Sequence, residues 1–238
     1  MKKKTSLVII LLILLMIFLG IKMVFFSDDI FYPKEKITGT GDIKIACVGD
    51  SITYGLGVLS NRDKSWTSLL VKELGSDYQT INYGLISRTL LSTGDYPYMN
   101  EKLANKFWNG KEDIIIFMLG TNDSKNINWN YNRFEKEYEG LIMKIKKEKS
   151  KSKLYIMIPP QIFINNPNRE KPNRNNLENG VIPIINKIND SYKFVKVIDL
   201  YTLTKDHKEW FPDGIHPNAV GNKKIAVEIA KVIKGNEE

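Results

Sequence analysis

The chain has 238 residues, a formal net charge of +8, and hydrophobic and charged fractions of 42% and 26%. These fractions are typical of a folded domain and exclude a disordered polar chain, and the length suffices for one sizeable core. Half of the net charge comes from residues 1–26, and the other basic stretch, residues 144–153, is expected to be the solvated end of a helix, so no nucleic-acid partner is expected.

The first segment has the pattern of a transmembrane signal-anchor. Three lysines at residues 2–4 precede an almost uninterrupted apolar run over residues 7–26, whose length as a helix, about 30 Å, matches a bilayer core. Lysines before the run and Asp28 and Asp29 after it predict a cytoplasmic N-terminus and an extracytoplasmic domain. The competing interpretation is a cleaved signal peptide, which would release a secreted domain, although a small-residue cleavage site is hard to find.

The rest of the chain is predicted to be a linker and one domain. Residues 27–41 contain Pro33, Gly39 and Gly41 and have the composition of a short linker, which leaves residues 42–238 for the domain. We find no internal repeat and no second domain in that range.

Apolar runs typical of buried strands alternate with helical patterns through the domain. In chain order we expect a strand over residues 43–48, a helix over 66–74, a strand over 79–83, a helix over 98–108, a strand over 113–119, a helix over 132–148, a strand over 154–158, a helix over 176–191, a strand over 194–200 and a helix over 219–233. This alternation predicts an α/β fold in three α/β/α layers around a central, mainly parallel five-stranded sheet.

Polar segments follow the first three strands, at the edge where ligands bind to parallel sheets. They read GDSITYG over residues 49–55, NYG over 82–84 and GTND over 120–123, and a fourth segment, DGIHP, spans residues 213–217. Each of them alone is a common kind of turn. Together, in this order and at strand ends, they favour an active site.

The scarcity of histidine and cysteine limits the catalytic groups that the chain could use. Cys47, the only cysteine, lies inside a predicted strand and is expected to be buried and inert, which excludes a disulfide and a cysteine-based metal site. With two histidines in the chain, we expect no metal and no organic cofactor. A serine nucleophile needs a base, and because His207 lies in a charged stretch that is expected on the surface, His216 is the candidate.

The four segments resemble the sequence blocks of the SGNH/GDSL hydrolase family, which supply a serine, a glycine, an asparagine and a histidine. The resemblance covers about residues 44–234, and the stretches over 88–98 and 118–125 are most similar to acetylesterases of the sialate O-acetylesterase-like branch. It implies a flavodoxin-like three-layer fold and a serine esterase.

The resemblance and the chemistry of the side chains assign five site residues. Ser51 is the expected nucleophile, His216 its base, and Asp213, three residues earlier, the carboxylate that orients the ring. The oxyanion hole is expected to consist of the backbone N–H groups of Ser51 and Gly84 and the side-chain amide of Asn122.

The second block departs from the family. It commonly reads Gly-x-Ser-Gly, whereas Ile86 and Ser87 occupy the Ser-Gly positions here. A β-branched Ile86 would resist any positive φ, so the sequence does not decide the backbone path of this loop.

Four further residues are candidates for lining the substrate cleft. They are Tyr54, Tyr96, Asp123 and Trp129. The aromatic residues fit a structural role equally well; Trp129, for example, could cap the long helix that follows it.

These roles predict an extracytoplasmic serine esterase that hydrolyses short-chain esters through an acyl-enzyme, with acetyl groups on carbohydrate as the expected substrate. The expected partners are a glycan or small-molecule ester and, through the first helix, the cell membrane. Two alternatives stay open. One is an O-acetyltransferase that acts on cell-surface glycan, and the other is a non-catalytic glycan-binding domain.

Overall fold

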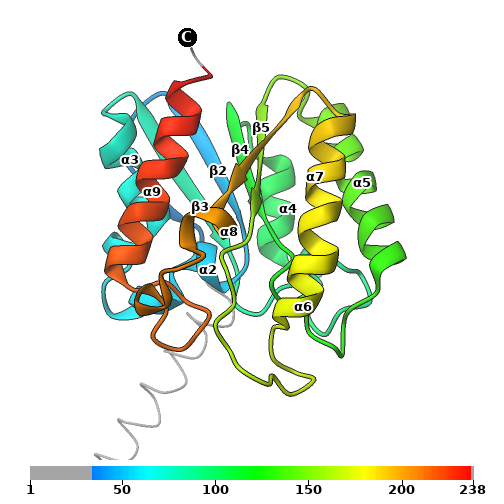
Figure 1. Ribbon diagram of the computed structural model, residues 1–238. Coiled ribbons are helices and arrows are strands. Elements are labelled where there is room, and N and C mark those ends of the chain that lie inside the picture. Colours follow the sequence, from blue (N-terminus) through cyan, green and yellow to red (C-terminus); the bar gives the residue numbers. More distant parts are fainter. Residues whose placement is uncertain (1–33, 237–238) are drawn as a thin grey trace, which may run out of the picture. The chain divides into compact units, whose positions relative to one another are not determined.

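The computed structural model describes residues 34–236, and a six-stranded sheet forms its centre (Figure 1). The sheet order is β1-β3-β2-β4-β5-β6, in which β2 to β6 pair in parallel and β1 pairs antiparallel with β3. The strands are β1 (Lys36–Thr38), β2 (Ile43–Gly49), β3 (Tyr78–Gly84), β4 (Ile114–Met118), β5 (Lys153–Ile158) and β6 (Val195–Asp199).

The predicted three-layer α/β fold with a mainly parallel sheet is confirmed, but the count of five strands is wrong. The additional strand, β1, lies inside the segment 27–41 that was predicted to be a linker. It has three residues, of which only Ile37 is apolar, so it carries no alternating pattern that would reveal a strand. Its pairing with β3, with Lys36 opposite Asn82, is a tertiary contact.

Helices cover both faces of the sheet. Figure 1 shows α4, α5 and α7 on one face and α3 and α9 on the other. The helices are α2 (Ser51–Tyr54), α3 (Trp66–Leu74), α4 (Lys102–Asn109), α5 (Tyr131–Glu148), α6 (Arg174–Asn176), α7 (Ile182–Ser191), α8 (Leu200–Thr204) and α9 (Ala219–Lys234). Shorter helical segments are η1 (Leu56–Lys64), η2 (Tyr98–Asn100), η3 (Leu177–Val181) and η4 (Lys208–Trp210).

The two cores follow from the alternation of side chains along the strands. In β2, Ala46 and Val48 pack into the core shared with α4, α5 and α7, whereas Ile45 and Cys47 pack into the core shared with α3 and α9. Because successive strand residues face opposite layers, a strand that helices cover on both faces has apolar residues at successive positions. Cys47 is fully buried, as predicted, and burial raises the pKa of its thiol far above the usual range.

The helix predicted over residues 176–191 is divided into α6, the π-helical segment η3 and α7. The ring of Trp129 lies against Gly180 in η3, where a Cβ would come within 2.1 Å of the indole. Pro183 lies in the first turn of α7, where its missing N–H is tolerated. A bulky ring thus packs directly against the irregular part of the helix, a contact that the sequence pattern alone does not reveal.

The basic stretch over residues 144–153 contains one buried lysine. The Nζ of Lys149 lies 3.1 Å from Glu112 Oε2 and donates to the carbonyl of Gly110, and the hydroxyl of Tyr83 donates to Glu112 Oε1. The expectation of a solvated helix end is therefore wrong at this position, because the end of α5 packs against the loop before β4.

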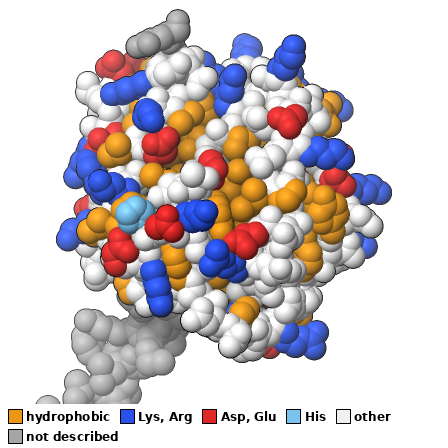
Figure 2. Space-filling model, viewed as in Figure 1, with side chains coloured by type: hydrophobic (Ala, Val, Ile, Leu, Met, Phe, Trp, Pro, Cys, Tyr) orange, Lys and Arg blue, Asp and Glu red, His pale blue; other side chains and the backbone are white. Residues whose placement is uncertain are grey.

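Within the described part of the chain, no helix combines the length and the apolar composition that a membrane span requires. The predicted anchor over residues 7–26 lies outside the described residues. On the face shown in Figure 2, basic and acidic side chains are interspersed, and hydrophobic side chains form a band between the α9 and α7 sides of the molecule. The edge strand β6, with Val197 half-buried, lies between these helices.

Candidate active site

The segments that follow the parallel strands meet at one edge of the sheet. Figure 1 shows α2, which follows β2, and α6, which lies after β5, at this same edge. The loops after β3 and β4 begin at this edge too, because these strands run parallel to β2 and β5. The sequence predicted this meeting point from the strand ends, and the structure shows which side chains reach it.

Ser51 begins the one-turn helix α2 directly after β2. The preceding Asp50 is fully buried and caps the helix, and its Oδ1 accepts a hydrogen bond from the N–H of Ile52 at 2.9 Å. The helix ends at Gly55, whose φ of 93° lies in the left-handed region that glycine adopts without strain. The short, capped turn fixes the direction of the Ser51 side chain.

Ser51, His216 and Asp213 form a hydrogen-bonded chain. The Oγ of Ser51 lies 2.8 Å from Nε2 of His216, and Nδ1 of His216 lies 2.5 Å from Oδ2 of Asp213. The other carboxylate oxygen of Asp213 accepts from the backbone N–H groups of Ile215 and His216 at 2.9 and 2.7 Å. The structure thus brings together the three residues that the sequence placed in a triad.

The surroundings of Asp213 keep its carboxylate ionised. Partial burial acts to raise its pKa, but the hydrogen bonds from the ring and the backbone of His216 and from the backbone of Ile215 outweigh this effect. Together they hold the pKa of Asp213 well below its usual range. Its side chain is 56% exposed, whereas that of His216 is 14% exposed. The arrangement suits an imidazole that becomes positively charged.

A buried asparagine anchors the segment that carries His216. Asn222, on the first turns of α9, is 1% exposed. Its Nδ2 donates to the carbonyl of Pro217 at 2.6 Å, and its Oδ1 accepts from the N–H of Trp66 at 2.8 Å. The residue after His216 is therefore tied to the start of α3.

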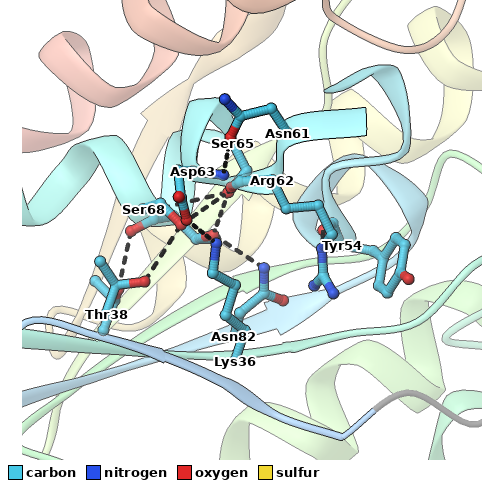
Figure 3. A network of polar contacts seen from close by, with 11 residues as sticks. Lys36, Thr38, Tyr54, Asn61, Arg62, Asp63, Ser65, Ser68 and Asn82 are labelled. Carbon is cyan, nitrogen blue, oxygen red and sulfur yellow. Dashed lines mark hydrogen bonds and ion pairs between the residues drawn. The ribbon is translucent and has the colours of Figure 1, made fainter. Parts of the chain in front are cut away.

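A second buried asparagine anchors α2. The Nδ2 of Asn82, on β3, donates to the carbonyl of Thr53 at 2.8 Å and contacts the hydroxyl of Thr67 at 2.9 Å. Figure 3 shows Asn82 within a polar network and Arg62 close to Tyr54, the last residue of α2. The Nε of Arg62 donates to the Tyr54 carbonyl at 3.0 Å. The helix that carries Ser51 is thus held from its far side.

The structure does not support the predicted oxyanion role of Gly84. Its N–H donates to Oδ1 of Asn82 at 2.8 Å and is therefore already used. A Cβ at this position would lie 2.3 Å from the backbone nitrogen of Tyr54. Glycine is required here because β3 approaches α2 closely, which is a packing requirement.

Ser87 is the residue of this loop that sequence reasoning missed. Its φ of 65° is positive, whereas that of Ile86 is not. In residues 34–236 no hydrogen bond from the Ser87 N–H to another protein group is found. The available signal was the alignment of Ser87 with the glycine of the family's block, because a position that favours glycine is often one with positive φ.

Asn122 lies between this loop and the start of α2. Its Nδ2 donates to the carbonyl of Arg88 at 3.2 Å and lies 3.5 Å from Oδ2 of Asp50. Its own carbonyl accepts from Nδ2 of Asn128 at 2.9 Å. The predicted amide donor is thus next to the nucleophile turn and is held by its neighbours.

Three of the four residues predicted to line the cleft have other surroundings. Tyr54 is buried under Arg62, whose Cζ lies 3.8 Å from the ring centroid. Trp129 packs against Gly180, and Asp123 is fully buried. Only Tyr96, 53% exposed, is open to solvent as a lining residue would be.

Asp123 supports the loop after β3 from within the protein. Its two carboxylate oxygens accept hydrogen bonds from the N–H groups of Leu90 and Leu91 at 3.0 and 2.8 Å. Burial raises its pKa to about 7 despite these bonds. Burial likewise raises the pKa of Asp50 to about 6. Two buried acids therefore order the loops beside Ser51.

The two histidines have different surroundings, as predicted. His207 stacks on Trp210, with ring centroids 3.7 Å apart, and its Nδ1 lies 2.9 Å from Glu209 Oε1. Within residues 34–236 it makes no hydrogen bond to Ser51, Asn122 or Asp213. In the same part of the chain, no group of three His, Cys, Asp or Glu side chains could hold a metal ion.

Comparison with known proteins assigns the sequence to a family and finds solved structures that share its fold. The pattern of the family described as GDSL-like lipase/acylhydrolase matches residues 45–229. The chain is 36% identical over 218 residues to an acetylxylan esterase of Xylanibacter ruminicola, a match that covers 85% of this chain. It spans only 44% of that protein's length.

Solved structures share the fold at lower sequence identity. A carbohydrate acetylesterase family member from Sinorhizobium meliloti superimposes with a TM-score of 0.66 at 21% identity, covering 81% of this chain and 98% of the other. An acetyl xylan esterase gives a TM-score of 0.62 at 23% identity, covering 80% and 100% of the two chains. These likenesses establish that the same fold is present.

The raised pKa of Asp123 predicts a pH-dependent contribution to stability. Its folded-state pKa of about 7 exceeds the ordinary value of about 3.9, so the folded protein binds this proton more tightly than the unfolded chain. Stability contributed by this group is therefore fully present below pH ~4 and is lost as the pH rises to about 7. Asp123→Asn removes the titration.

Urea unfolding of both proteins at several pH values measures this effect. We expect the wild-type protein to lose stability relative to Asp123→Asn as the pH rises, by at most about 1.4 kcal/mol per pH unit. Asp50 titrates in both proteins and largely cancels in the difference. A difference that stays constant with pH would contradict the raised pKa.

Proposed function

The chain belongs to the GDSL-like lipase/acylhydrolase family of carboxylic ester hydrolases, and on this premise we propose that it removes acetyl groups from carbohydrate with Ser51, His216 and Asp213 as its catalytic triad. The observation that carries the proposal is the hydrogen-bonded chain from Ser51 Oγ through both ring nitrogens of His216 to Asp213, at 2.8 and 2.5 Å. Similarity to a protein named acetylxylan esterase supports acetyl as the acyl group and carbohydrate as its carrier.

The proposed reaction proceeds in two steps. Ser51 Oγ attacks the ester carbonyl while Nε2 of His216 takes its proton, and Asp213 stabilises the resulting imidazolium. The imidazolium then protonates the leaving sugar oxygen, which leaves an acetyl-enzyme. Water, deprotonated by His216, attacks this intermediate and releases acetate.

The tetrahedral intermediates need donors for their negative oxygen. The proposed donors are the N–H groups of Ser51 and Ser87 and the Nδ2 of Asn122. The contacts of this Nδ2 with the Arg88 carbonyl and Asp50 Oδ2, at 3.2 and 3.5 Å, are longer than the 2.8 Å bond that occupies the Gly84 N–H, and substrate binding would have to replace one of them. The positive φ of Ser87 supports its inclusion, because it turns the loop at the point where Gly84 no longer has a free N–H. Asp123 accepts hydrogen bonds from the N–H groups of this loop, and Asn128 donates to the carbonyl of Asn122. These bonds hold the loop and Asn122 in place before substrate arrives, which is the condition for effective electrostatic stabilisation.

The proposed location of the enzyme is the outer face of the cell membrane. The apolar run over residues 7–26, the lysines at 2–4 and the acids at 28–29 support an uncleaved anchor with the domain outside the cytoplasm. An esterase held there would meet polysaccharides outside the cell.

Removal of the nucleophile or the base tests the reaction. With the full chain in detergent and p-nitrophenyl acetate as substrate, we expect Ser51→Ala and His216→Ala each to lower kcat by about 10⁴-fold or more, because the residues act as a unit. Asp213→Asn should lower it by up to about 10⁴-fold, since an amide would disturb the tautomer of His216.

Matched controls come from the same chain. His207→Ala removes the other histidine and Ser60→Ala an exposed serine of η1, and both should retain kcat. A fully active His216→Ala protein would end the triad proposal. Chromatography of the products separates hydrolysis, which yields free acetate, from transfer, which yields a newly acetylated sugar.

The donor role of Ser87 is tested by a pair of substitutions. Ser87→Gly keeps the N–H and fits a positive φ, so kcat should be unchanged. Ser87→Val opposes the positive φ and should turn the N–H away, with a fall in kcat of about 10²–10³ and little change in KM. Equal activity of the two variants would exclude Ser87 from the oxyanion hole.

Cell fractionation tests the proposed location. We expect the full-length protein in the membrane fraction, resistant to extraction with high salt and released by detergent, because an apolar helix rather than surface charge would hold it. External protease should digest the domain in intact cells whose outer layers have been removed. A shortened chain in the medium would instead indicate a cleaved signal peptide.

A further inference from the structure

A polar cavity lies at the same edge of the sheet as Ser51. One wall consists of residues 164–167, from the loop after β5, and the other of Asn173, Arg174, Asn175 and Glu178, around α6. We refer to it as the asparagine cavity. Its volume of about 510 Å³ falls in the range of pockets that bind small organic ligands.

The first wall touches the segment that carries the base and its carboxylate. The N–H of Phe163 donates to the carbonyl of Gly214 at 2.9 Å. A Cβ on Gly214 would lie 3.1 Å from Cγ1 of Ile164. Because Gly214 lies between Asp213 and His216 in the chain, this wall begins directly beside the proposed triad.

The second wall is bonded to the segment that carries the proposed oxyanion donor. The N–H of Asn173 donates to Ser124 Oγ at 3.0 Å, and Nδ2 of Asn176 donates to the carbonyl of Ser124 at 2.8 Å. Nδ2 of Asn173 also donates to Oδ1 of Asn126. Ser124 follows Asn122 by two residues, so the cavity is bounded by the two loops that bound the reaction centre.

Hydrogen bonds and packing tie the loop that forms the cavity to its neighbours. The N–H of Ile127 donates to the carbonyl of Arg169 at 3.0 Å, which ties the loop to the segment after β4. The ring of Trp129 against Gly180 fixes η3, directly after α6. Asn166 adopts a φ of 48°, a conformation that asparagine tolerates better than most residues. A prearranged site loses less conformational entropy on binding.

The side chains of the cavity offer paired donors and acceptors. An asparagine amide presents one carbonyl oxygen and one NH2 group, and a sugar hydroxyl both donates and accepts. Among the described residues, no hydrogen bond is made by the side-chain amides of Asn165 and Asn166, which are exposed. The Oδ1 of Asn175 accepts a hydrogen bond from Nδ2 of Asn179, which leaves the NH2 group of Asn175 available to a ligand.

The charges in the cavity compensate each other. The Nε of Arg174 lies 2.7 Å from Oε1 of Glu178, and the same carboxylate accepts a hydrogen bond from the hydroxyl of Tyr201. A guanidinium already paired in this way is a poor site for an additional anion. Ile164 and Pro167 add apolar surface, which suits the C–H face of a sugar ring. The chemistry therefore favours an uncharged polyhydroxyl ligand.

We infer that the asparagine cavity binds neutral pyranose units of a polysaccharide chain, next to the sugar whose acetyl group reaches Ser51. The inference rests on the proposed esterase function and adds to it a substrate class, a neutral glycan chain rather than a single acetylated sugar or a charged glycan. Asn165 and Asn175 are its specificity-determining residues, and binding at the cavity increases the affinity for long substrates.

The test compares a substrate that reaches the cavity with one that does not. Acetylated xylotetraose extends beyond the reaction centre, whereas p-nitrophenyl acetate is too small to do so. For Asn165→Ala and Asn165→Ala/Asn175→Ala we expect kcat/KM on the tetraose to fall about three- to ten-fold for each lost hydrogen bond, mainly through KM. Activity on p-nitrophenyl acetate should stay within about two-fold, since no interaction with that ester is removed.

A matched control is Asn105→Ala. Asn105 is an exposed asparagine on α4 that lines a different cavity, of about 480 Å³, and its loss should change neither activity. Thermal melting of all variants monitors folding. Equal losses on both substrates, or no loss on the tetraose, would overturn the inference.

A binding measurement separates this inference from the proposed function. Calorimetry of the full-length Ser51→Ala protein with unacetylated xylotetraose should detect binding, weakened in Ser51→Ala/Asn165→Ala. A tetragalacturonate of the same length carries carboxylates and should bind more weakly. An inactive wild-type protein that still binds xylotetraose through Asn165 would refute the esterase and retain the cavity. An active esterase without such binding, or with preference for the charged chain, would refute the cavity assignment.

Discussion

The hydrogen bond between Ser51 Oγ and His216 Nε2 joins two positions 165 residues apart, and the rest of the site maintains this contact. A nucleophile and its base must stay within hydrogen-bond reach, so each segment needs an anchor. Asn82 holds the helix of Ser51 and Asn222 holds the residue after His216. Both asparagines also bond to the first turn of α3, one to a side chain and one to a backbone N–H. The start of α3 is thus a common reference for both partners.

Buried acids build the other side of the site. Asp50 and Asp123 lie out of contact with water, and burial raises the pKa of each. Burying a carboxyl group is unfavourable, and it is tolerated here because both accept hydrogen bonds from backbone N–H groups of the surrounding turns. The loops beside Ser51 are consequently ordered by the protein interior. Such order is the condition for the proposed role of backbone N–H groups as fixed donors toward a developing negative charge.

The asparagine cavity is bonded to the same loops that carry the candidate site residues. Its walls are bonded to Gly214 and to Ser124, which belong to the loops of the base and of Asn122. A ligand in the cavity would therefore be held in a fixed relation to the reaction centre. Binding energy from parts of a substrate that do not react can in this way raise kcat/KM for a polymer above that for a small ester. In this proposal, different residues of the same loops recognise the polysaccharide chain and react with its ester.

The sequence by itself determined the parallel α/β sheet, because apolar runs such as Ile114–Met118, buried at every position, alternate with helical patterns. It also determined Ser51, Asp213 and His216 as partners, because the chain has only two histidines that could be the base of a serine nucleophile. It did not reveal β1, whose three residues carry no periodic pattern. It assigned to Gly84 the donor role that we propose for Ser87, because hydrogen-bond partners and φ angles depend on contacts between segments distant in the chain. The burial of Asp123 and the packing of Trp129 depend on such contacts as well. Only the tertiary structure decided which polar groups are already satisfied and which are left for a substrate.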